Sequence, residues 1–293
     1  YGIKPLLYLS DEDKFIFASE MKSLLHYGID KSLDYTALAT YFQLNYIPAP
    51  RTAFAVVKKL LPGHYIQVKR GDVRIHPYYT IPYPAPQPTA TSYEQAQQLL
   101  FQKLEASVQR RLVADVPLGA FLSGGIDSSV VTGLAARHKP NLHTFSIGFR
   151  DQKFFDETDY ARKVAKHFGT EHTVFSLTTQ DLYAQLHSVL DYLDEPFADS
   201  SAVNVYILSQ QTRKQATVAL SGDGADEVFG GYTKHLAFAR AMQGGWKESL
   251  AAALKPAWQV LPKSRHAPFS NTVRQLLRYA EGHGMSARDR YWH

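Results

Sequence analysis

The sequence predicts an α/β fold in which a parallel sheet carries helices on both faces, preceded by part of a β-rich domain. Two patterns along the chain lead to this prediction. From Ser92 onward, short apolar runs alternate with segments of helical periodicity, and this alternation is typical of parallel sheets covered on both faces. Before residue 80, the chain instead has short strand-like runs separated by polar turns, with few helical patterns.

The N-terminal segment predicts strands and turns. Strand-like runs cover Leu6–Leu9, Phe15–Ala18 and Tyr65–Val68, and turn-forming residues at Ser10–Asp13 and Arg70–Asp72 separate them. We interpret this segment as one part of a β-rich domain, because it has fewer than 90 residues and few helical patterns.

A proline-rich stretch separates the two halves of the chain. Five prolines lie between Ile75 and Tyr93, together with glutamine and threonine. This composition favours an extended, semi-rigid linker over residues 80–92. The same prolines exclude a membrane-spanning helix in this stretch.

The second half alternates strands and helices in order. A capping-box pattern at Ser92 and Gln95 begins a helix whose apolar residues recur as far as Leu112. Gly169 is a usual residue just beyond a helix end. The other expected elements are a strand at Leu118–Leu122, a glycine-rich turn at Ser123–Asp127, a helix at Ser128–Arg137, a strand at Leu142–Phe149, a helix at Asp156–His167, a strand at His172–Phe175, helices at 178–193 and 201–215, a strand at Thr217–Leu220, and a basic, helical remainder after Gly222.

The composition excludes several classes of protein. With 45% hydrophobic residues and a formal charge of 32 − 27 = +5, the 293 residues are those of a globular protein, so a disordered, collagen-like or coiled-coil chain is excluded. The lysines and arginines form no recognisable nucleic-acid module, and no nucleic-acid partner is expected. The absence of cysteine excludes thiol catalysis, disulfides and thiolate metal sites from these residues. No signal peptide or membrane span is visible, and we expect a cytoplasmic location without a membrane partner.

A glycine- and serine-rich string follows the first strand of the second half. It consists of Ser123-Gly124-Gly125-Ile126-Asp127-Ser128-Ser129 and opens into a helix. Two glycines bring backbone N–H groups close to an anion, and the hydroxyls and the positive helix end attract it further. The string is not a Walker motif, because Gly125-Ile126 stands where Lys-Ser/Thr is required. A Ser-Gly-Gly turn alone is most often structural, but the full string predicts a pyrophosphate cradle that works with Mg²⁺.

A second string, Ser221-Gly222-Asp223-Gly224-Ala225-Asp226-Glu227, follows another apolar strand. Its three carboxylates at a helix start could serve only to stabilise the helix dipole. Beside a phosphate cradle, the same carboxylates would act as Mg²⁺ ligands or steer an amine nucleophile. Asp127 and Asp226 each stand near the end of a strand of one predicted sheet, so they could bind one metal ion together.

The two strings together resemble those of glutamine-hydrolysing asparagine synthetases. The resemblance covers essentially the whole chain. The further runs that carry it are Val228-Phe229-Gly230-Gly231-Tyr232, Thr144-Phe145-Ser146-Ile147-Gly148-Phe149, Phe155-Asp156-Glu157, Asp194-Glu195-Pro196-Phe197-Ala198-Asp199-Ser200-Ser201, Tyr1-Gly2-Ile3-Lys4-Pro5-Leu6, Phe17-Ala18-Ser19-Glu20 and Leu61-Pro62-Gly63-His64-Tyr65.

The resemblance implies a domain organisation. Residues 1–79 would be the C-terminal part of a class II glutamine amidotransferase domain of the Ntn type, and residues 80–92 a linker. Residues 93–293 would be an asparagine synthetase domain, truncated at its C-terminal end. That domain would be a PP-loop ATP pyrophosphatase, similar to the adenine nucleotide alpha hydrolases.

The resemblance also implies the reaction. Aspartate would attack the α-phosphorus of ATP to give β-aspartyl-AMP and pyrophosphate, and ammonia from glutamine would displace AMP to give asparagine. The partners implied are therefore aspartate, ATP, and glutamine or ammonia, with ATP as substrate and Mg²⁺ as cofactor. A homodimer is compatible with the resemblance.

The site residues that the resemblance implies fall into three groups. The catalytic group comprises Asp223, Glu227 and Asp127, with Asp223 beside the acyl-adenylate, where it would help to deprotonate the incoming ammonium. The metal ligands would be Asp127 and Asp226. The ATP and pyrophosphate site would comprise Leu122, Ser123, Gly124, Gly125, Asp127, Ser128, Ile147, Gly148, Ser221 and Gly222.

The chain departs from the family pattern at both ends. The family's glutaminase nucleophile is an N-terminal cysteine, and a late lysine of the synthetase site would lie beyond His293. We therefore expect a fragment of a longer protein. Two alternatives stay open. One is a β-lactam-forming relative, although such enzymes depart from the run Asp226–Tyr232. The other is a non-catalytic nucleotide-binding scaffold, against which the intact carboxylates count.

Overall fold

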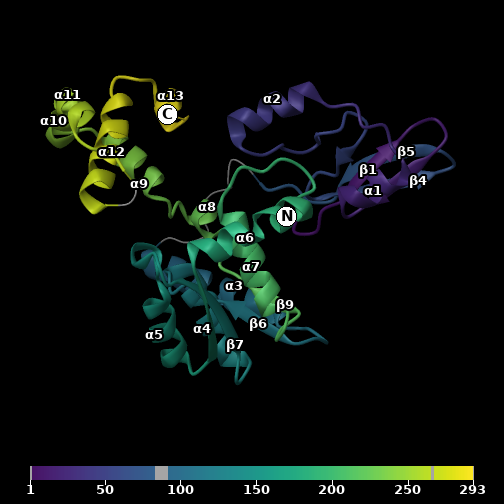
Figure 1. Cartoon of the computed structure of the whole chain (residues 1–293), viewed down its shortest axis with the longest axis horizontal. Helices are drawn as coiled ribbons and strands as arrows, with labels where there is room; N and C mark the ends of the chain where they lie inside the picture. The colour runs from purple at the N-terminus through teal and green to yellow at the C-terminus, as the bar shows by residue number, and fades with distance from the viewer. Residues whose placement is uncertain (1, 83–91, 265–266, 293) are drawn as a thin grey trace. The chain divides into compact units, whose positions relative to one another are not determined.

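The chain divides into two compact units in the computed structural model (Figure 1). The first comprises Tyr1–Ser107 and Leu177–Gln215, and the second comprises Val108–Ser176 and Ala216–His293. The structure describes residues 2–82, 92–264 and 267–292, without the side chains of residues 247, 248 and 292. Most of the predicted linker, residues 83–91, lies outside the described residues.

Antiparallel strands form the β part of the first unit. β1 (Leu7–Ser10) pairs with β2 (Phe15–Ala18) on one side and with β3 (Lys58–Lys59) on the other. β4 (His64–Lys69) and β5 (Asp72–Pro77) form a separate hairpin. Its two-residue turn has φ values of 50° at Arg70 and 82° at Gly71. Two consecutive positive values are the requirement of a type I′ turn, which suits the twist of a hairpin.

The helices of the first unit come from both of its segments. They are α1 (Met21–Tyr27), α2 (Tyr35–Leu44), most of α3 (Tyr93–Arg111), α6 (Thr179–Tyr192) and α7 (Ser201–Thr212). The sequence did not lead us to expect α1 and α2, which are short helices between strands. The strands and α1 share one apolar cluster, which consists of Leu7, Leu9, Met21, Leu24, Ile29 and Val57.

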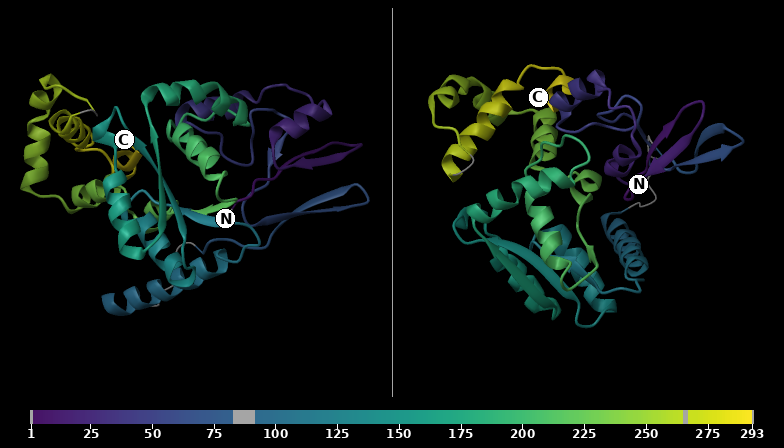
Figure 2. Two further views of the ribbon diagram at one scale, coloured as in Figure 1. Left: turned by 60° about the horizontal axis from the view of Figure 1, so that its bottom comes forward. Right: turned by 45° about the vertical axis from the view of Figure 1, so that its right-hand side comes forward.

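A parallel sheet forms the centre of the second unit, as the sequence predicts. Its strands are β6 (Leu118–Phe121), β7 (His143–Phe149), β8 (Glu171–Leu177) and β9 (Val218–Leu220), in the spatial order β8-β7-β6-β9. β6 pairs in parallel with both β7 and β9. α4 (Ile126–His138) and α5 (Thr158–Phe168) pack against β6 and β7 respectively (Figures 1 and 2).

Helices complete the second unit. A short 3-10 turn (Lys153–Phe155) precedes α5. After β9 follow α8 (Ala225–Phe229), α9 (Thr233–Gln243), α10 (Trp246–Ala253), α11 (Lys255–Val260), α12 (Pro268–Glu281) and α13 (Ala287–Trp292). No helix among the described residues is long and apolar enough to cross a membrane.

Close packing within the sheet depends on Gly119 in β6. A Cβ at this position would lie 2.6 Å from the ring of Phe145 and 2.7 Å from the carbonyl oxygen of His143. Phe145 is fully buried and stacks on Phe175 of β8, with ring centroids 6.1 Å apart. Glycine therefore serves here to bring β6 and β7 together over a large aromatic side chain.

The strand order reverses between β6 and β9. The chain passes from β6 to β7 to β8 in one direction and then places β9 on the opposite side of β6. Ligands of such sheets bind beyond the carboxyl ends of the strands at this switch point. The two loops that leave β6 and β9 are the two strings that the sequence singled out, Ser123–Ser129 and Ser221–Glu227.

In the first unit, Asp34 begins α2 and is also the partner of an arginine. Its Oδ1 accepts a hydrogen bond from the backbone N–H of Ala37 at 3.0 Å, and its Oδ2 accepts one from Arg51 at 2.6 Å. The Ala37 amide, and after it the Arg51 side chain, lower the pKa of this carboxyl below its ordinary value, although its burial opposes them. Asp34 therefore caps the helix and ties it to the segment that precedes β3.

We expect Asp34→Ala to lower the free energy of unfolding at neutral pH by about 1–2 kcal/mol, chiefly through the lost helix cap. Because the pKa is lower in the folded state, the stabilisation is complete above the unfolded pKa, near 4, and is lost as the pH falls through the folded pKa. Urea denaturation at neutral and acidic pH measures this difference. Asp13→Ala, in an exposed turn, is the control. If Asp34→Ala lowered the free energy of unfolding equally at acidic and neutral pH, the ionised carboxylate would not be the source of the stabilisation.

Candidate active site

The first site loop joins β6 to α4 and is held by its own serines. Ser123 and Ser128 lie with their Oγ atoms 2.9 Å apart, and the Ser123 N–H donates to Ser128 Oγ at 3.2 Å. The Gly125 N–H donates to Ser123 Oγ, and Ser129 Oγ donates to the Gly125 carbonyl at 2.6 Å. These bonds fold Ser123–Ser129 into a compact loop before any ligand binds.

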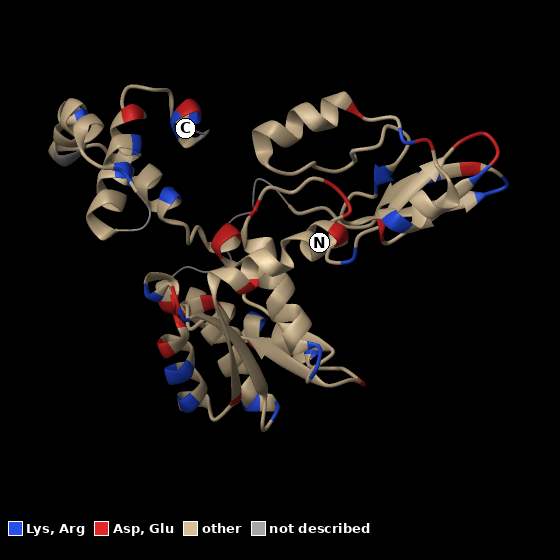
Figure 3. Ribbon diagram, in the orientation of Figure 1, with Lys and Arg blue, Asp and Glu red and all other residues tan. Residues whose placement is uncertain are grey.

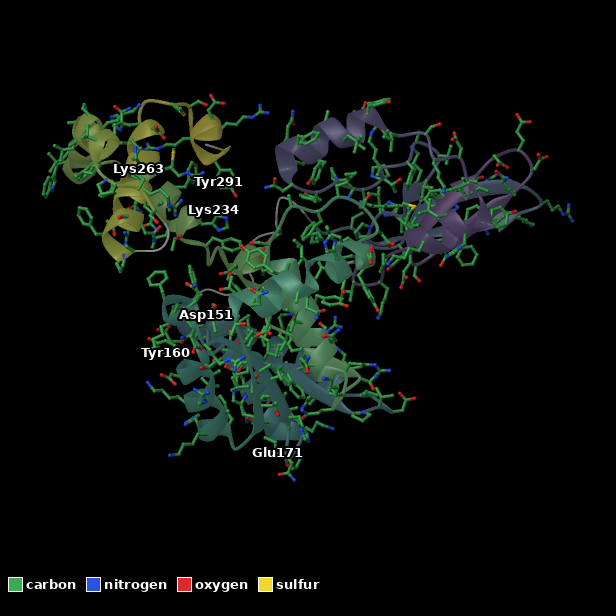
Figure 4. The ribbon with its side chains drawn as sticks, viewed as in Figure 1. Asp151, Tyr160, Glu171, Lys234, Lys263 and Tyr291 are labelled. Atoms are coloured by element: carbon green, nitrogen blue, oxygen red, sulfur yellow. The ribbon has the colours of Figure 1, made fainter. Side chains whose placement is uncertain are left out.

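Gly124 gives this loop its shape for two reasons. Its φ is 87°, in the left-handed region that favours glycine. A Cβ there would also lie 2.5 Å from the nitrogen of Ala161 and 2.6 Å from the Cβ of Tyr160. Tyr160, labelled in Figure 4, belongs to α5, so the loop rests directly on the beginning of that helix.

The beginning of α4 offers N–H groups to a ligand. Gly125 occupies the N-cap position, and no side chain caps the helix there. The first N–H groups of an uncapped helix lack partners within the helix, and they attract anions together with the helix dipole. The 13-residue helix therefore presents a positive end to the loop that leads into it.

The second site loop touches the first at Gly222. A Cβ at this position would lie 2.8 Å from the nitrogen of Ser128, 2.9 Å from the carbonyl carbon of Asp127 and 3.0 Å from its Cβ. Glycine thus allows the backbone that leaves β9 to pass directly over the beginning of α4. The structure brings the two strings together, as expected from parallel strands of one sheet.

The carboxylates of the second loop differ in their surroundings. Asp223 is exposed, and its Oδ2 accepts a hydrogen bond from Ser221 Oγ at 3.0 Å. Asp226 and Glu227 follow in α8, which appears as acidic in Figure 3. Asp226 is half-buried, and the Oδ1 of Asp226 lies against Gly231, where a Cβ would collide with it.

Glu227 is engaged by a tyrosine. Tyr232 Oη donates a hydrogen bond to Glu227 Oε1 at 2.5 Å. This bond raises the pKa of Tyr232 to about 12 and is the main cause that lowers the pKa of Glu227. At neutral pH the pair consists of a neutral phenol and a carboxylate, which makes Glu227 a weak base.

The residues expected around the adenine lie at the ends of β6 and β7. Leu122 is 1% exposed and packs on Ala161 and Ala165, so only its backbone remains for a ligand. Gly148 is buried, and a Cβ there would lie 2.6 Å from Thr158. Ile147, between two buried residues of β7, is half-buried.

Hydrogen bonds hold the strand beneath Ile147. His172 of β8 contacts Thr144 Oγ1 through Nδ1 at 2.9 Å and Ser146 Oγ through Nε2 at 3.1 Å. Burial first, and then the positive charge of Arg162, lower the pKa of His172. A neutral imidazole with one donor and one acceptor suits two hydroxyl partners.

The carboxylates of Asp127 and Asp226 fit a Mg²⁺ ion that also binds the phosphates of a nucleotide. No group of three or more histidine, aspartate or glutamate side chains that could bind a metal ion occurs in the part of the chain that the structure describes. Within that part, no hydrogen-bond donor reaches the carboxylates of Asp127 and Asp226, which leaves their oxygens available. Mg²⁺ commonly binds one or two carboxylates together with substrate phosphates, so these residues fit it.

The sequence did not predict two contacts of the site. Tyr232 belongs to a run that carries the family resemblance, but no role was expected for it. Its bond to Glu227 forms across the end of α8, where Gly230 adopts a left-handed conformation. The support of Gly124 by Tyr160 joins segments that no local pattern connects.

Two family models match the chain. The asparagine synthase model matches residues 100–292, and the glutamine amidotransferase domain model matches residues 1–79. A solved structure of NMN synthetase from Francisella tularensis aligns with 70% of this chain and 94% of its own at a TM-score of 0.36 and 18% identity. A likeness this weak says nothing about function.

Curated relatives carry the same family name. Asparagine synthetase [glutamine-hydrolyzing] 1 of Bacillus subtilis is 37% identical over 233 residues, which are 79% of this chain and 36% of the relative. Asparagine synthetase [glutamine-hydrolyzing] 3 of the same organism is 31% identical over 247 residues, 79% of this chain and 40% of the relative. The chain thus spans well under half the length of these relatives. Because the asparagine synthase model alone covers about two thirds of its 293 residues, the chain belongs to the asparagine synthase family.

Proposed function

We propose that this chain is part of an ATP-dependent amide ligase that converts aspartate to asparagine through β-aspartyl-AMP and releases AMP and pyrophosphate. The observation that carries the proposal is the contact of the two site loops at Gly222, which lies against Asp127 and Ser128. An anion cradle and a group of carboxylates therefore meet at the switch point of one sheet.

The cradle accounts for pyrophosphate as the leaving group. The hydroxyls of Ser123 and Ser128, with the N–H groups at the start of α4, would hold the β and γ phosphates of ATP. The α-phosphorus would then face the second loop as the exposed electrophile. Leu122, Ile147 and Gly148 would frame the adenine, with Leu122 contributing backbone atoms, and Ser221 and Gly222 would contact the nucleotide near its ribose or α-phosphate.

Asp127 and Asp226 would hold Mg²⁺ between the two loops. The ion would supply positive charge to the phosphates when it is bound. The engagement of Glu227 by Tyr232 favours these two aspartates over Glu227 as ligands. Glu227 would instead contribute a fixed negative charge beside the site.

Asp223 is the residue that we assign to the second half of the reaction. It is exposed at the end of β9 and oriented by Ser221 Oγ. A carboxylate in this position can accept a proton from an ammonium ion that approaches the acyl-adenylate. The ammonia would come from glutamine, because residues 1–79 match the glutamine amidotransferase domain model and the names of the relatives include glutamine hydrolysis. The cytoplasmic location remains a prediction.

Asp127→Asn removes one negative charge from the cradle and keeps its shape. We expect the affinity for Mg·ATP, or the rate of adenylation, to fall by about one to two orders of magnitude, because a charge-assisted contact is lost. Isothermal titration calorimetry and pyrophosphate release measure the two quantities. Asp115→Asn, on an exposed loop before β6, is the matched control. Unchanged binding together with unchanged pyrophosphate release would remove Asp127 from the site.

Asp223→Ala separates the two half reactions. In the full-length parent, with aspartate, ATP and ammonium, we expect adenylate formation to persist while amide formation slows by about 10²–10⁴, the usual contribution of one positioned acid–base group. Pyrophosphate and asparagine are measured in parallel. An equal loss of both products would assign Asp223 to nucleotide binding instead.

An experiment with ¹⁸O-labelled aspartate distinguishes attack at the α-phosphorus of ATP from phosphoryl transfer. Aspartate labelled with ¹⁸O in its side-chain carboxylate is incubated with the full-length protein, ATP and ammonium. One labelled oxygen passes to AMP if that carboxylate attacks the α-phosphorus and ammonia then displaces AMP from the acyl carbon. Label in free phosphate, with ADP as the co-product, identifies a phosphoryl-transfer ligase and overturns the proposal.

A further inference from the structure

The turn between α6 and α7 has no role in the proposed reaction. It covers residues 193–200 and contains Asp194-Glu195-Pro196, one of the runs that carry the family resemblance. In the structure this turn is bound to the N-terminal part of the chain. Both partners belong to the first compact unit.

An ion pair forms the centre of this attachment. Lys59 of β3 donates to Glu195 Oε1 and, at 2.6 Å, to the carbonyl oxygen of Ile47. The side chains of Lys59 and Glu195 are only 24% and 18% exposed. A pair this far removed from water is sensitive to the loss of either partner, because the remaining charge is left without compensation.

Two further contacts surround the pair. The N–H of Ala198 donates to the carbonyl oxygen of Asn45 at 2.9 Å. Lys22 of α1 lies over the ring of Tyr192, at the end of α6, with its Nζ 5.0 Å from the ring centroid. The turn is therefore held at its beginning, at Glu195 and near its end.

Each contact joins the two regions that the family models match separately. Asn45, Lys59 and Lys22 lie within residues 1–79, while their partners lie within residues 100–292. The turn leads along the chain through α7 to β9, whose loop begins with Ser221 and Gly222. The turn is therefore bound to the glutamine amidotransferase region, and along the chain it precedes the segment that enters the ligase site.

The turn depends on Lys59 for its charge balance. Glu195 Oε2 and Asp194 Oδ1 are buried and have no hydrogen-bond partner among the described residues. Without Lys59, the turn would carry two poorly solvated carboxylates. Solvation of these groups would favour movement of the turn away from β3.

We propose that Lys59 is a positioning residue that, through Glu195, couples ammonia production from glutamine to amide synthesis. The proposal rests on the proposed function of the ligase site. It assigns neither residue a contact with substrate. The held turn fixes residues 193–200 against the glutamine amidotransferase region, and the chain continues from there through α7 and β9 to the second site loop.

Lys59→Met in the full-length protein tests the coupling. We expect the ratio of asparagine formed to glutamate released to fall by about fivefold or more, the lower range of coupling between sites. Synthesis from saturating ammonium and glutamine hydrolysis without ATP should keep their wild-type rates, because neither reaction requires transfer between the regions. Lys58→Met, the neighbouring lysine of β3, is the matched control, and Lys59→Arg should restore much of the ratio.

The outcomes separate the two proposals. A wild-type protein that makes no asparagine from ammonium refutes the proposed function, whereas an unchanged ratio in Lys59→Met refutes the coupling alone. Glu195→Gln should resemble Lys59→Met, and the double variant should lose little more than either one. Additive losses would mean that the two residues act independently.

A second measurement needs no activity. In the 293-residue chain, hydrogen exchange at the Ala198 amide should accelerate at least several-fold in Lys59→Met, while the amides of Leu9 and Leu24 in the apolar cluster stay protected. Unchanged protection of Ala198 would show that Lys59 does not hold the turn, and would overturn the inference whatever the enzyme does.

Discussion

The parallel pairing of β9 with β6 is the constraint on which the site depends. If β9 paired beyond β8, at the other edge, two strands would separate it from β6, whose loop is the first site loop. Beside β6, the backbone at Gly222 passes over the start of α4 so closely that a single methyl group would collide with it. The strand order therefore accounts both for the place where the two site loops meet and for the glycine at the crossing.

Local patterns sufficed for much of the second unit. The observed strands and helices lie within a few residues of the bounds that the sequence predicts. The signals were the apolar run at Leu118, the periodic segment before His167 and the glycine at position 169. The glycine-rich string was recognisable because a tight turn between strand and helix restricts the residue types it can contain. These features depend on neighbours along the chain, which is why the sequence alone reveals them.

Short helices and contacts between distant segments were not predictable in this way. The helices α1 and α2 are too short for periodicity to identify. The bond between Tyr232 and Glu227 joins residues only five apart, in a turn that no pattern singled out. The helix that supports Gly124 is set by tertiary packing. The same holds for the composition of the first unit, which takes residues 177–215 from beyond the first strands of the sheet. No hydrophobic pattern predicts that Lys59 pairs with Glu195, which lies 136 residues later in the chain.

That separation has a consequence for the chain during its synthesis. At about 5–20 residues per second, Glu195 emerges from the ribosome roughly 7 to 27 seconds after Lys59. Among the described residues β3 lies at one edge of its antiparallel sheet, where the Lys59 N–H donates to the carbonyl oxygen of Pro50. Very short strands and lysines are the usual protection of such edges, and β3 consists of two lysines alone. Until Glu195 has been made, Lys59 therefore stands at a sheet edge without its carboxylate partner, as a charge of the kind that disfavours pairing with other strands.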